Sequence, residues 1–271
     1  MSDWPQTLVL AGAGKMGGAM LEGWLAGGLP AAGVTILEPT PSEQIRDLVA
    51  RHGLALNPET VAAPQTLVLA IKPQTLAAAA PKLASVAGPK TLVVSVLAGK
   101  TIANLQERLT AAKAFVRVMP NTPAAVGRGA TAGAANAAVT GEQKAWTERL
   151  MRAVGVFEWV DDEALVDAVT ALSGSGPAYA FALVEAMAKA GEAVGLPAEL
   201  AMRLARATVE GAGELMAREP QTPAAVLRQN VTSPGGTTAA ALGVLKAADG
   251  LDALLARAVT AARDRARELS G

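Results

Sequence analysis

The sequence predicts an α/β protein in two parts, a doubly wound sheet domain at residues 1–162 followed by an all-α domain at residues 163–271. In the first part, short and nearly continuous apolar runs alternate with segments of helical spacing. This alternation is typical of a parallel sheet covered by helices on both faces. After about Asp162 the apolar runs stop and only helical patterns follow.

Strands of the first part are expected where apolar residues run together, and helices where they recur three or four positions apart. The expected strands are residues 7–11, 34–38, 66–70, 91–95, 114–118 and 156–160. The helices expected between them are residues 15–25, 42–51, 75–85, 101–108 and 141–153.

The second part is expected to hold helices at residues 164–172, 178–195, 197–219, 222–229, 238–248 and 251–269. Leu183, Met187, Ala190 and Val194 recur at helical spacing, and such a stripe is most simply the core of its own domain. Many alanine-lined helices could instead bury one face against a second copy of the chain, which predicts a symmetric homodimer.

Composition excludes several classes of protein. Of the 271 residues 51% are apolar and 18% are charged, which is typical of a folded chain. Lys+Arg and Asp+Glu both total 24, so no bulk positive field is available for nucleic acid or an anionic membrane. There is no cysteine and one histidine, which argues against disulfides and metal sites. We find neither an apolar stretch of about 18 residues nor a secretory signal, and expect a cytoplasmic protein without a membrane partner.

The first expected strand leads into Gly12-Ala13-Gly14-Lys15-Met16-Gly17, a G-x-G-x-x-G pattern that opens a helix. Gly12 permits a tight turn, Gly14 lets the backbone approach a pyrophosphate, and Gly17 allows close packing of helix and strand. N–H groups at the helix start then face the anion. The pattern in this context predicts a Rossmann-type dinucleotide site.

The second expected strand ends at Glu38, 21 positions after Gly17. A carboxylate there would bind the ribose hydroxyls of NAD and repel the extra phosphate of NADP. The turn after it also carries the hydroxyls of Thr40 and Ser42, which could cradle that phosphate. The cofactor is therefore expected to be NAD(P)H, with NADH favoured and NADPH left open.

Further cofactor contacts are expected on loops that follow other strands of the sheet. Asn121 lies between Pro120 and Pro123, where it could bond the nicotinamide end, although an asparagine in a proline-rich turn is also common for local reasons. Lys72 could approach a phosphate or ribose, or be simply solvated. The expected contacts outside the glycine loop are Glu38, Asn57, Ala70, Ile71, Lys72, Pro73, Ala98, Gly99 and Asn121.

Three longer motifs resemble those of pyrroline-5-carboxylate reductases in order and spacing. They are Met119-Pro120-Asn121-Thr122-Pro123, residues 172–179 (LSGSGPAY) and residues 231–238 (VTSPGGTT). The resemblance spans roughly residues 6–269. The Ser-Pro-Gly-Gly-x-Thr loop is highly specific to that family, whereas the glycine loop is widely shared.

The resemblance implies a Rossmann domain followed by a helical dimerisation domain, with dimers that form decamers in several members. It implies reduction of 1-pyrroline-5-carboxylate to L-proline, the last step of proline biosynthesis, by hydride transfer to the C=N carbon. It also implies that Thr238 bonds the ring nitrogen. One departure is Glu38, because many members that use NADPH carry a neutral residue there.

The loop before residue 238 suits a substrate carboxylate. Ser233-Pro234-Gly235-Gly236-Thr237-Thr238 places two glycines and several hydroxyls at a helix start, where backbone N–H groups gather into an anion nest. Ser233, Gly235, Gly236 and Thr237 are expected to hold the carboxylate, with Ser175 on the opposite wall. Without the resemblance, Thr238 could equally be an N-cap hydroxyl, and Arg228 a cation near the nest or an exposed residue.

Two other functions compete with this one. A β-hydroxyacid dehydrogenase needs a lysine base, but neither Lys189 nor Lys246 lies in a glycine- or serine-rich turn. A non-catalytic dinucleotide-sensing scaffold would explain the glycine loop but not a second anion nest. The histidine, His52, is expected at a helix end on the surface, and an imine that binds already protonated needs no acid–base pair.

Overall fold

The computed structural model describes residues 4–270 and forms two compact units, residues 1–175 together with 262–271, and residues 176–261. The compact units divide at residue 175, whereas the sequence predicts a domain boundary after residue 162. Two short elements that follow residue 162 belong to the first unit, α6 (Leu165–Val169) and the π-helical turn η4 (Thr170–Gly174). Val166 of α6 is fully buried in a cluster with Met119 and Ala134 of the sheet, which explains the later division.

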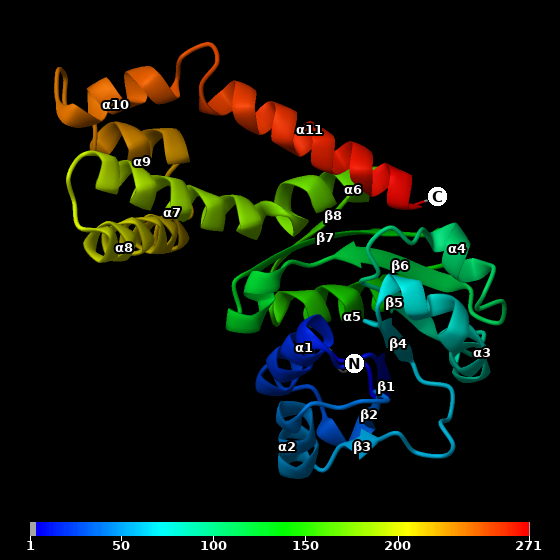
Figure 1. Ribbon diagram of the computed structural model, residues 1–271. Helices are drawn as coiled ribbons and strands as arrows, with labels where there is room; N and C mark the ends of the chain where they lie inside the picture. Colours follow the sequence, from blue (N-terminus) through cyan, green and yellow to red (C-terminus); the bar gives the residue numbers. More distant parts are fainter. Residues whose placement is uncertain (1–3, 271) are drawn as a thin grey trace. The chain divides into compact units, whose positions relative to one another are not determined.

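The first unit is built on an eight-stranded sheet in the order β3-β2-β1-β4-β5-β6-β7-β8 (Figure 1). All neighbouring strands are parallel except β6 and β7, which are antiparallel. The six expected strands are confirmed to within one or two residues. The strands are β1 (Leu8–Ala11), β2 (Val34–Leu37), β3 (Ala55–Leu56), β4 (Thr66–Leu69), β5 (Leu92–Ser95), β6 (Ala114–Met119), β7 (Gly129–Ala135) and β8 (Gly155–Trp159).

β3 and β7 were not expected from the sequence. β3 has only two residues, and β7 reads Gly-Ala-Thr-Ala-Gly-Ala-Ala, a composition of low strand propensity. Tertiary context overrides that propensity, because β7 lies between β6 and β8 and pairs with both.

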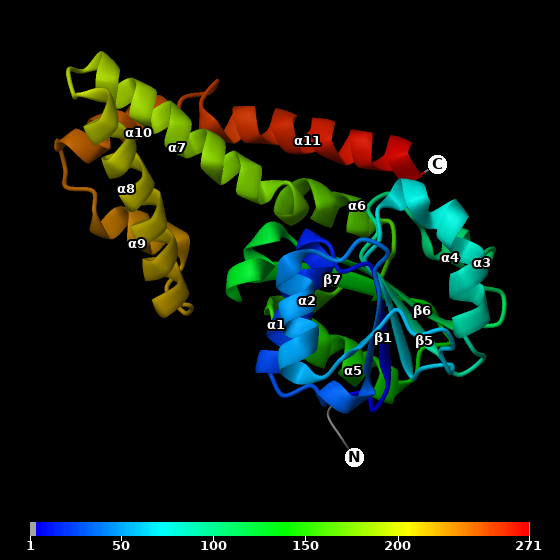
Figure 2. The same cartoon turned by 60° about the horizontal axis from the view of Figure 1, so that its bottom comes forward.

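Helices cover both faces of the sheet (Figure 2). One core lies against α1 (Lys15–Ala26), α2 (Glu43–His52) and α5 (Gly141–Arg152), and takes Leu8 and Leu10 from β1. The other lies against α3 (Leu76–Val86) and α4 (Ile102–Gln106), and takes Val9 and Ala11. Alternate residues of one strand therefore pack into the cores on opposite faces of the sheet. Short 3₁₀ turns are η1 (Ala31–Gly33), η2 (Pro73–Thr75) and η3 (Thr122–Val126).

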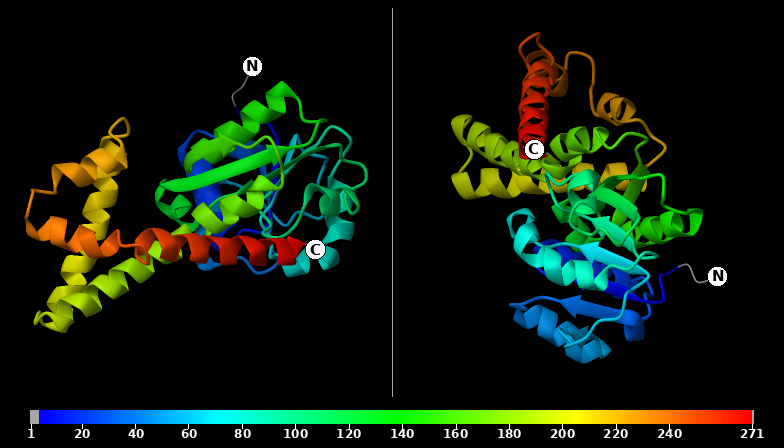
Figure 3. Two further views of the ribbon diagram at one scale, coloured as in Figure 1. Left: turned by 90° about the horizontal axis from the view of Figure 1, so that it is seen from above. Right: turned by 90° about the vertical axis from the view of Figure 1, so that its right-hand side faces the viewer.

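The second unit contains helices only, in its described residues (Figure 3). Its buried side chains are alanines, Ala188 of α7 and Ala201 and Ala205 of α8, and a Cβ on Gly191 would lie 3.1 Å from the Ala201 Cβ. Small residues thus let α7 and α8 approach closely. The helices are α7 (Gly176–Ala193), α8 (Ala198–Arg218), α9 (Ala224–Asn230), α10 (Thr237–Leu245) and α11 (Leu251–Ser270), which continues into the first unit.

Large apolar side chains of the helical unit lie at the surface of the single chain. Phe181 is 64% exposed, Val194 83% and Val244 74%. Exposed apolar surface of this extent indicates contact with another protein surface. None of the described helices combines the length and apolar character needed to cross a membrane.

Candidate cofactor and substrate sites

The glycine loop joins β1 to α1, and its three glycines serve different ends. Gly12 has φ +92°, and a Cβ there would lie 2.6 Å from the Ala70 backbone. A Cβ on Gly17 would overlap the carbonyl oxygen of Gly12. A Cβ on Gly14 would meet no atom within 4 Å, and Gly14 caps α1 without a side-chain hydrogen bond. Gly12 and Gly17 are therefore required for packing, whereas Gly14 leaves open space above the first turn of α1, where backbone N–H groups attract anions.

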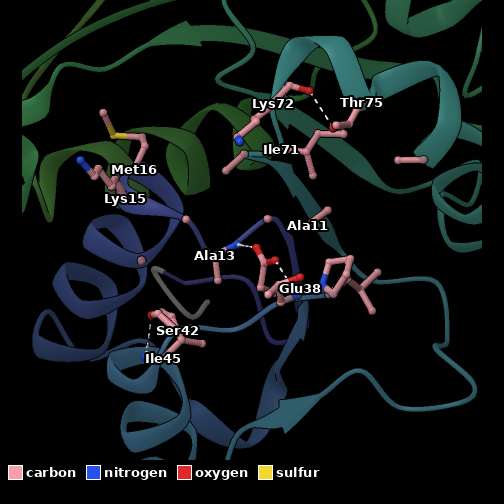
Figure 4. A pocket seen from close by; sticks show the side chains of 18 of the residues that line it. Ala11, Ala13, Lys15, Met16, Glu38, Ser42, Ile45, Ile71, Lys72 and Thr75 are labelled. Atoms are coloured by element: carbon pink, nitrogen blue, oxygen red, sulfur yellow. Dashed lines mark hydrogen bonds between the residues drawn. The ribbon is translucent and has the colours of Figure 1, made fainter.

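Glu38 lies directly after β2 and its carboxylate bonds the glycine loop (Figure 4). Oε2 accepts a 2.9 Å hydrogen bond from the Ala13 N–H, and Oε1 accepts one of 3.0 Å from the Thr40 N–H. Asn57 holds the Glu38 backbone at both ends: its Oδ1 accepts from the Glu38 N–H at 2.9 Å, and its Nδ2 donates to the Glu38 carbonyl at 2.8 Å. Asn57 has φ +48°, a left-handed conformation that asparagine tolerates.

A cleft of about 1390 Å³ surrounds these loops. This is larger than most small-molecule pockets, which measure roughly 300–1,000 Å³, and suits an extended ligand such as a dinucleotide. Ten of the expected cofactor residues line it: Gly12, Ala13, Gly14, Lys15, Met16, Glu38, Asn57, Ala70, Ile71 and Lys72.

Five expected cofactor residues do not line the cleft. Gly17 is buried in helix packing, and Pro73 begins η2. Ala98 and Gly99 lie in the loop after β5, where a Cβ on Gly99 would come within 2.8 Å of the Leu269 carbonyl of α11. Asn121 is 8% exposed, and its amide is engaged inside the protein: Oδ1 accepts from the Ala130 N–H at 2.8 Å, and Nδ2 donates to the Ser173 carbonyl at 2.9 Å.

Sequence reasoning missed part of the lining. Thr122 and Ala125 come from η3, and Thr75 and Lys82 from the segment that follows the Ala70–Pro73 loop. These four residues lie close in sequence to expected cofactor residues, and this closeness is the one sequence feature that could have predicted them. Ser42, whose hydroxyl was considered for a phosphate, also lines the cleft but accepts the Ile45 N–H at 3.3 Å as the N-cap of α2.

In the helical unit, residues 233–236 form a tight turn ahead of α10. Gly235 has φ +70°, and the Gly236 N–H donates to the Ser233 carbonyl at 3.1 Å. Ser233 Oγ occupies the place that a Cβ on Gly236 would need. The N-cap of α10 is Gly236, so the alternative that Thr238 caps this helix is wrong. The half-buried Thr238 lies in the first turn of the helix, where N–H groups lack intrahelical partners.

The remaining candidates are placed as follows. Ser175 is the last residue of the first unit, and its N–H donates to the Thr170 carbonyl at 2.8 Å, the i to i+5 bond of the π-turn. Arg228 and Lys246 line a small hollow between α9 and α10, and Lys246 also pairs with Asp252 at 2.8 Å. Exposed Lys189 and ion-paired Lys246 do not resemble a buried lysine base.

His52 ends α2, as expected, and no described cluster of His, Asp or Glu could hold a metal ion.

Comparison with known proteins matches two family models. Residues 163–269 match "Pyrroline-5-carboxylate reductase dimerisation", and residues 7–99 match "NADP oxidoreductase coenzyme F420-dependent". The chain is 41% identical over 266 residues to a pyrroline-5-carboxylate reductase of Pseudomonas aeruginosa, an alignment that covers 97% of this chain and 96% of the relative.

Solved structures agree with the sequence relatives. The pyrroline-5-carboxylate reductase of Coxiella burnetii has a TM-score of 0.90 at 36% identity, with 98% of this chain and 99% of that one covered. The pyrroline carboxylate reductase of Plasmodium falciparum, solved with NADP bound, has a TM-score of 0.80 at 26% identity, with 98% of each chain covered.

Proposed function

The chain belongs to the pyrroline-5-carboxylate reductase family, and we propose that its cleft binds NADH in preference to NADPH during the reaction of that family. The reaction is NAD(P)H-dependent reduction of the C=N bond of 1-pyrroline-5-carboxylate to give L-proline. The chain carries the dimerisation domain of the family and is a homo-oligomer. We also propose that the dimers assemble further, into a decamer, and that the protein is cytoplasmic.

The cleft of the first unit suits a dinucleotide for reasons of geometry. Gly14 leaves room where a pyrophosphate would approach, and the first turn of α1 offers uncapped N–H groups beside it. Lys15 and Lys72 add positive charge to the lining. When bound, the reduced cofactor supplies the hydride and leaves as NAD(P)+.

The preference for NADH is carried by one observation, the Glu38 carboxylate at the end of β2. A ribose with two hydroxyls can donate hydrogen bonds to a carboxylate, whereas a 2′-phosphate would place negative charge against it. The Ala13 and Thr40 N–H groups hold the carboxylate in place before any ligand arrives, so repulsion could be relieved only by breaking those bonds. The NADP bound to the Plasmodium falciparum relative is the reason for a direct test.

The substrate carboxylate is proposed to bind at the turn before α10. Ser233, Gly235 and Gly236 shape this turn, and the Thr237 N–H joins the Ser233 hydroxyl around the anion, whereas the Gly236 N–H donates to the Ser233 carbonyl within the turn. No arginine is needed, because the helix start supplies the partial positive charge.

Thr238 is proposed to orient the ring by bonding its nitrogen, and Ser175 is proposed to contact the substrate. The imine binds with its nitrogen protonated, which makes the C=N carbon electron-poor. A hydride adds to that carbon, the C=N π electrons pass to nitrogen, and the product is a neutral secondary amine that takes a proton from water on release. The residues supply orientation and proximity and no proton transfer in the hydride step.

The test is to follow nicotinamide absorbance while the purified protein meets 1-pyrroline-5-carboxylate, with NADH and NADPH in separate assays. A higher kcat/KM with NADH is expected. A higher kcat/KM with NADPH would overturn the cofactor proposal but not the reaction. Oxidation of neither cofactor by protein that binds one of them would contradict the assignment of substrate.

A further inference from the structure

One face of β6 contacts a single segment at three successive alternate positions. Arg117 Nη2 donates to Asp167 Oδ1 of α6 at 2.8 Å. Met119 lies against η4, where a Cβ on Gly174 would be 3.5 Å from the Met119 Cγ. Asn121 keeps the extended backbone of the strand, with φ −129° and ψ 168°, and donates to the η4 carbonyl of Ser173. Because side chains alternate along a strand, these three residues share the face that α6 and η4 cover.

Asn121 joins this segment to the cofactor cleft. It directly precedes η3, whose Thr122 and Ala125 line the cleft. Its Nδ2 holds the Ser173 carbonyl, and its Oδ1 holds the Ala130 N–H of β7. One buried amide therefore connects the cleft-lining turn, the sheet and the π-turn.

The segment it holds is an unusual one. A π-turn is rare in proteins, and such turns occur frequently at functional sites. The turn ends at Ser175, the residue proposed to face the substrate. Its backbone position depends on what holds Ser173.

We infer that Asn121 is a positioning residue for imine reduction. Its amide fixes the Ser173–Ser175 turn relative to η3, so that a substrate held at Ser175 stands at a constant distance from the nicotinamide. This inference rests on the proposed contact between Ser175 and the substrate. It assigns Asn121 a role beside the expected bond to the nicotinamide, because one hydrogen bond at each end of the amide goes to the protein.

Asn121→Asp tests the donor without changing shape. A protonated aspartic acid still donates to the Ser173 carbonyl and accepts from the Ala130 N–H, whereas a carboxylate opposes the carbonyl. Burial raises the pKa of this new carboxyl above the ordinary value of about 3.9. The charged groups of the elements packed there are Arg117 of β6, Asp167 of α6, Glu163 before it and the exposed Arg128 between η3 and β7, two of each sign, so burial is the cause of the shift. β7, η3 and η4 carry no charged residue.

The expected result is a loss of kcat/KM that depends on pH. Above the pKa of the new carboxyl, Asn121→Asp should lower kcat/KM for the imine by about tenfold to a hundredfold, as the loss of a buried hydrogen bond implies. The ratio of variant to wild-type kcat/KM should recover as the pH falls through that pKa. Asn121→Ala should show a similar loss without recovery. NADH affinity, measured by energy transfer from tryptophan, should change less than about twofold in both variants, since the glycine loop is untouched.

Asn136 supplies a matched control at the other end of β6. Its Oδ1 accepts from the Phe115 N–H at 3.1 Å, and its Nδ2 donates to the Lys113 carbonyl at 2.8 Å. Asn136→Asp breaks the same kind of bond away from the cleft and should leave kcat/KM unchanged. Equal losses in the Asn136 and Asn121 variants, or a loss at Asn121→Asp that does not recover at low pH, would overturn the inference. An inactive wild type would instead contradict the proposed function.

Discussion

Removal of the Glu38 charge should change cofactor choice, and Glu38→Gln does so with little change in shape. In the wild type, a 2′-phosphate of charge about −1.5 placed about 5 Å from the carboxylate, at an effective dielectric constant of about 40 for a half-buried site, is repelled by about 2.5 kcal/mol. That energy corresponds to a roughly 50- to 100-fold lower kcat/KM with NADPH than with NADH.

The variant should lose most of this discrimination, and part of its activity with both cofactors. Glutamine can accept only one of the two backbone N–H groups, from Ala13 or Thr40, and its own NH₂ would meet the other. The glycine loop is therefore less well held, so the NADPH gain should be smaller than the loss of repulsion alone would give. The assay measures kcat/KM with each cofactor at low and high salt. Added salt shortens the Debye length from about 8 Å at 0.15 M to about 3 Å at 1 M, and therefore screens the repulsion between the phosphate and the carboxylate.

A matched control is Glu22→Gln. Glu22 also lines the cleft, but its carboxylate accepts from the Gln44 side chain and not from the glycine loop. This variant should keep the wild-type ratio of the two cofactors. The reasoning is refuted if Glu38→Gln leaves that ratio within about twofold of wild type, or if the wild type discriminates equally at both salt concentrations.

Five further substitutions separate the roles of other residues. Gly17→Ala should lower the melting temperature, because the new Cβ would overlap backbone atoms. Gly14→Ala should leave the melting temperature unchanged but raise the Kd for NADH, measured by calorimetric titration, by about tenfold or more. An unchanged melting temperature for Gly17→Ala would contradict this account. Thr238→Ala should lower kcat/KM for the imine about tenfold to a thousandfold in steady-state assays, and complete inactivity of the folded variant would mean an essential chemical role. Asp167→Ala removes the carboxylate that pairs with the buried Arg117 at 2.8 Å, and should lower the free energy of unfolding in urea by about 3–5 kcal/mol. Asp264→Ala removes one partner of an exposed pair and should lower it by less than about 1 kcal/mol. Equal costs for the two aspartates would show that burial does not decide the difference.

Local chemistry explains which features the sequence predicts well. The glycine loop is contiguous, and its neighbours in sequence are its neighbours in space, so Gly12 to Met16, which were expected to contact the cofactor, line one cleft together. The inner parallel strands β1, β4 and β5 were visible because they are buried on both faces and carry nearly continuous apolar residues. β7 carries no such signal, and its antiparallel pairing with β6 depends on contacts that periodicity does not report.

Contacts between distant residues explain the errors. Glu163 is a charged residue with no motif around it in the sequence, but its Oε1 accepts the Ile102 N–H at 2.7 Å and lies 3.5 Å from Arg117. Asn121 sits in a proline-rich turn as expected, but only the fold shows that its amide is engaged by Ala130 and Ser173. A motif identifies a residue type at a place, whereas its partners come from the folded chain.

The helical stripe shows a further limit of periodicity. Leu183 and Val194 recur at helical spacing, and the simplest prediction was that they form the core of their own unit. They are 47% and 83% exposed in the single chain, while the unit buries alanines. Spacing reports that a face is apolar but not which chain covers it. Residues 163–269 match a dimerisation model, and a second copy of the chain is the expected partner for an apolar face that one chain leaves uncovered. The stability of this unit should accordingly be linked to assembly and depend on protein concentration.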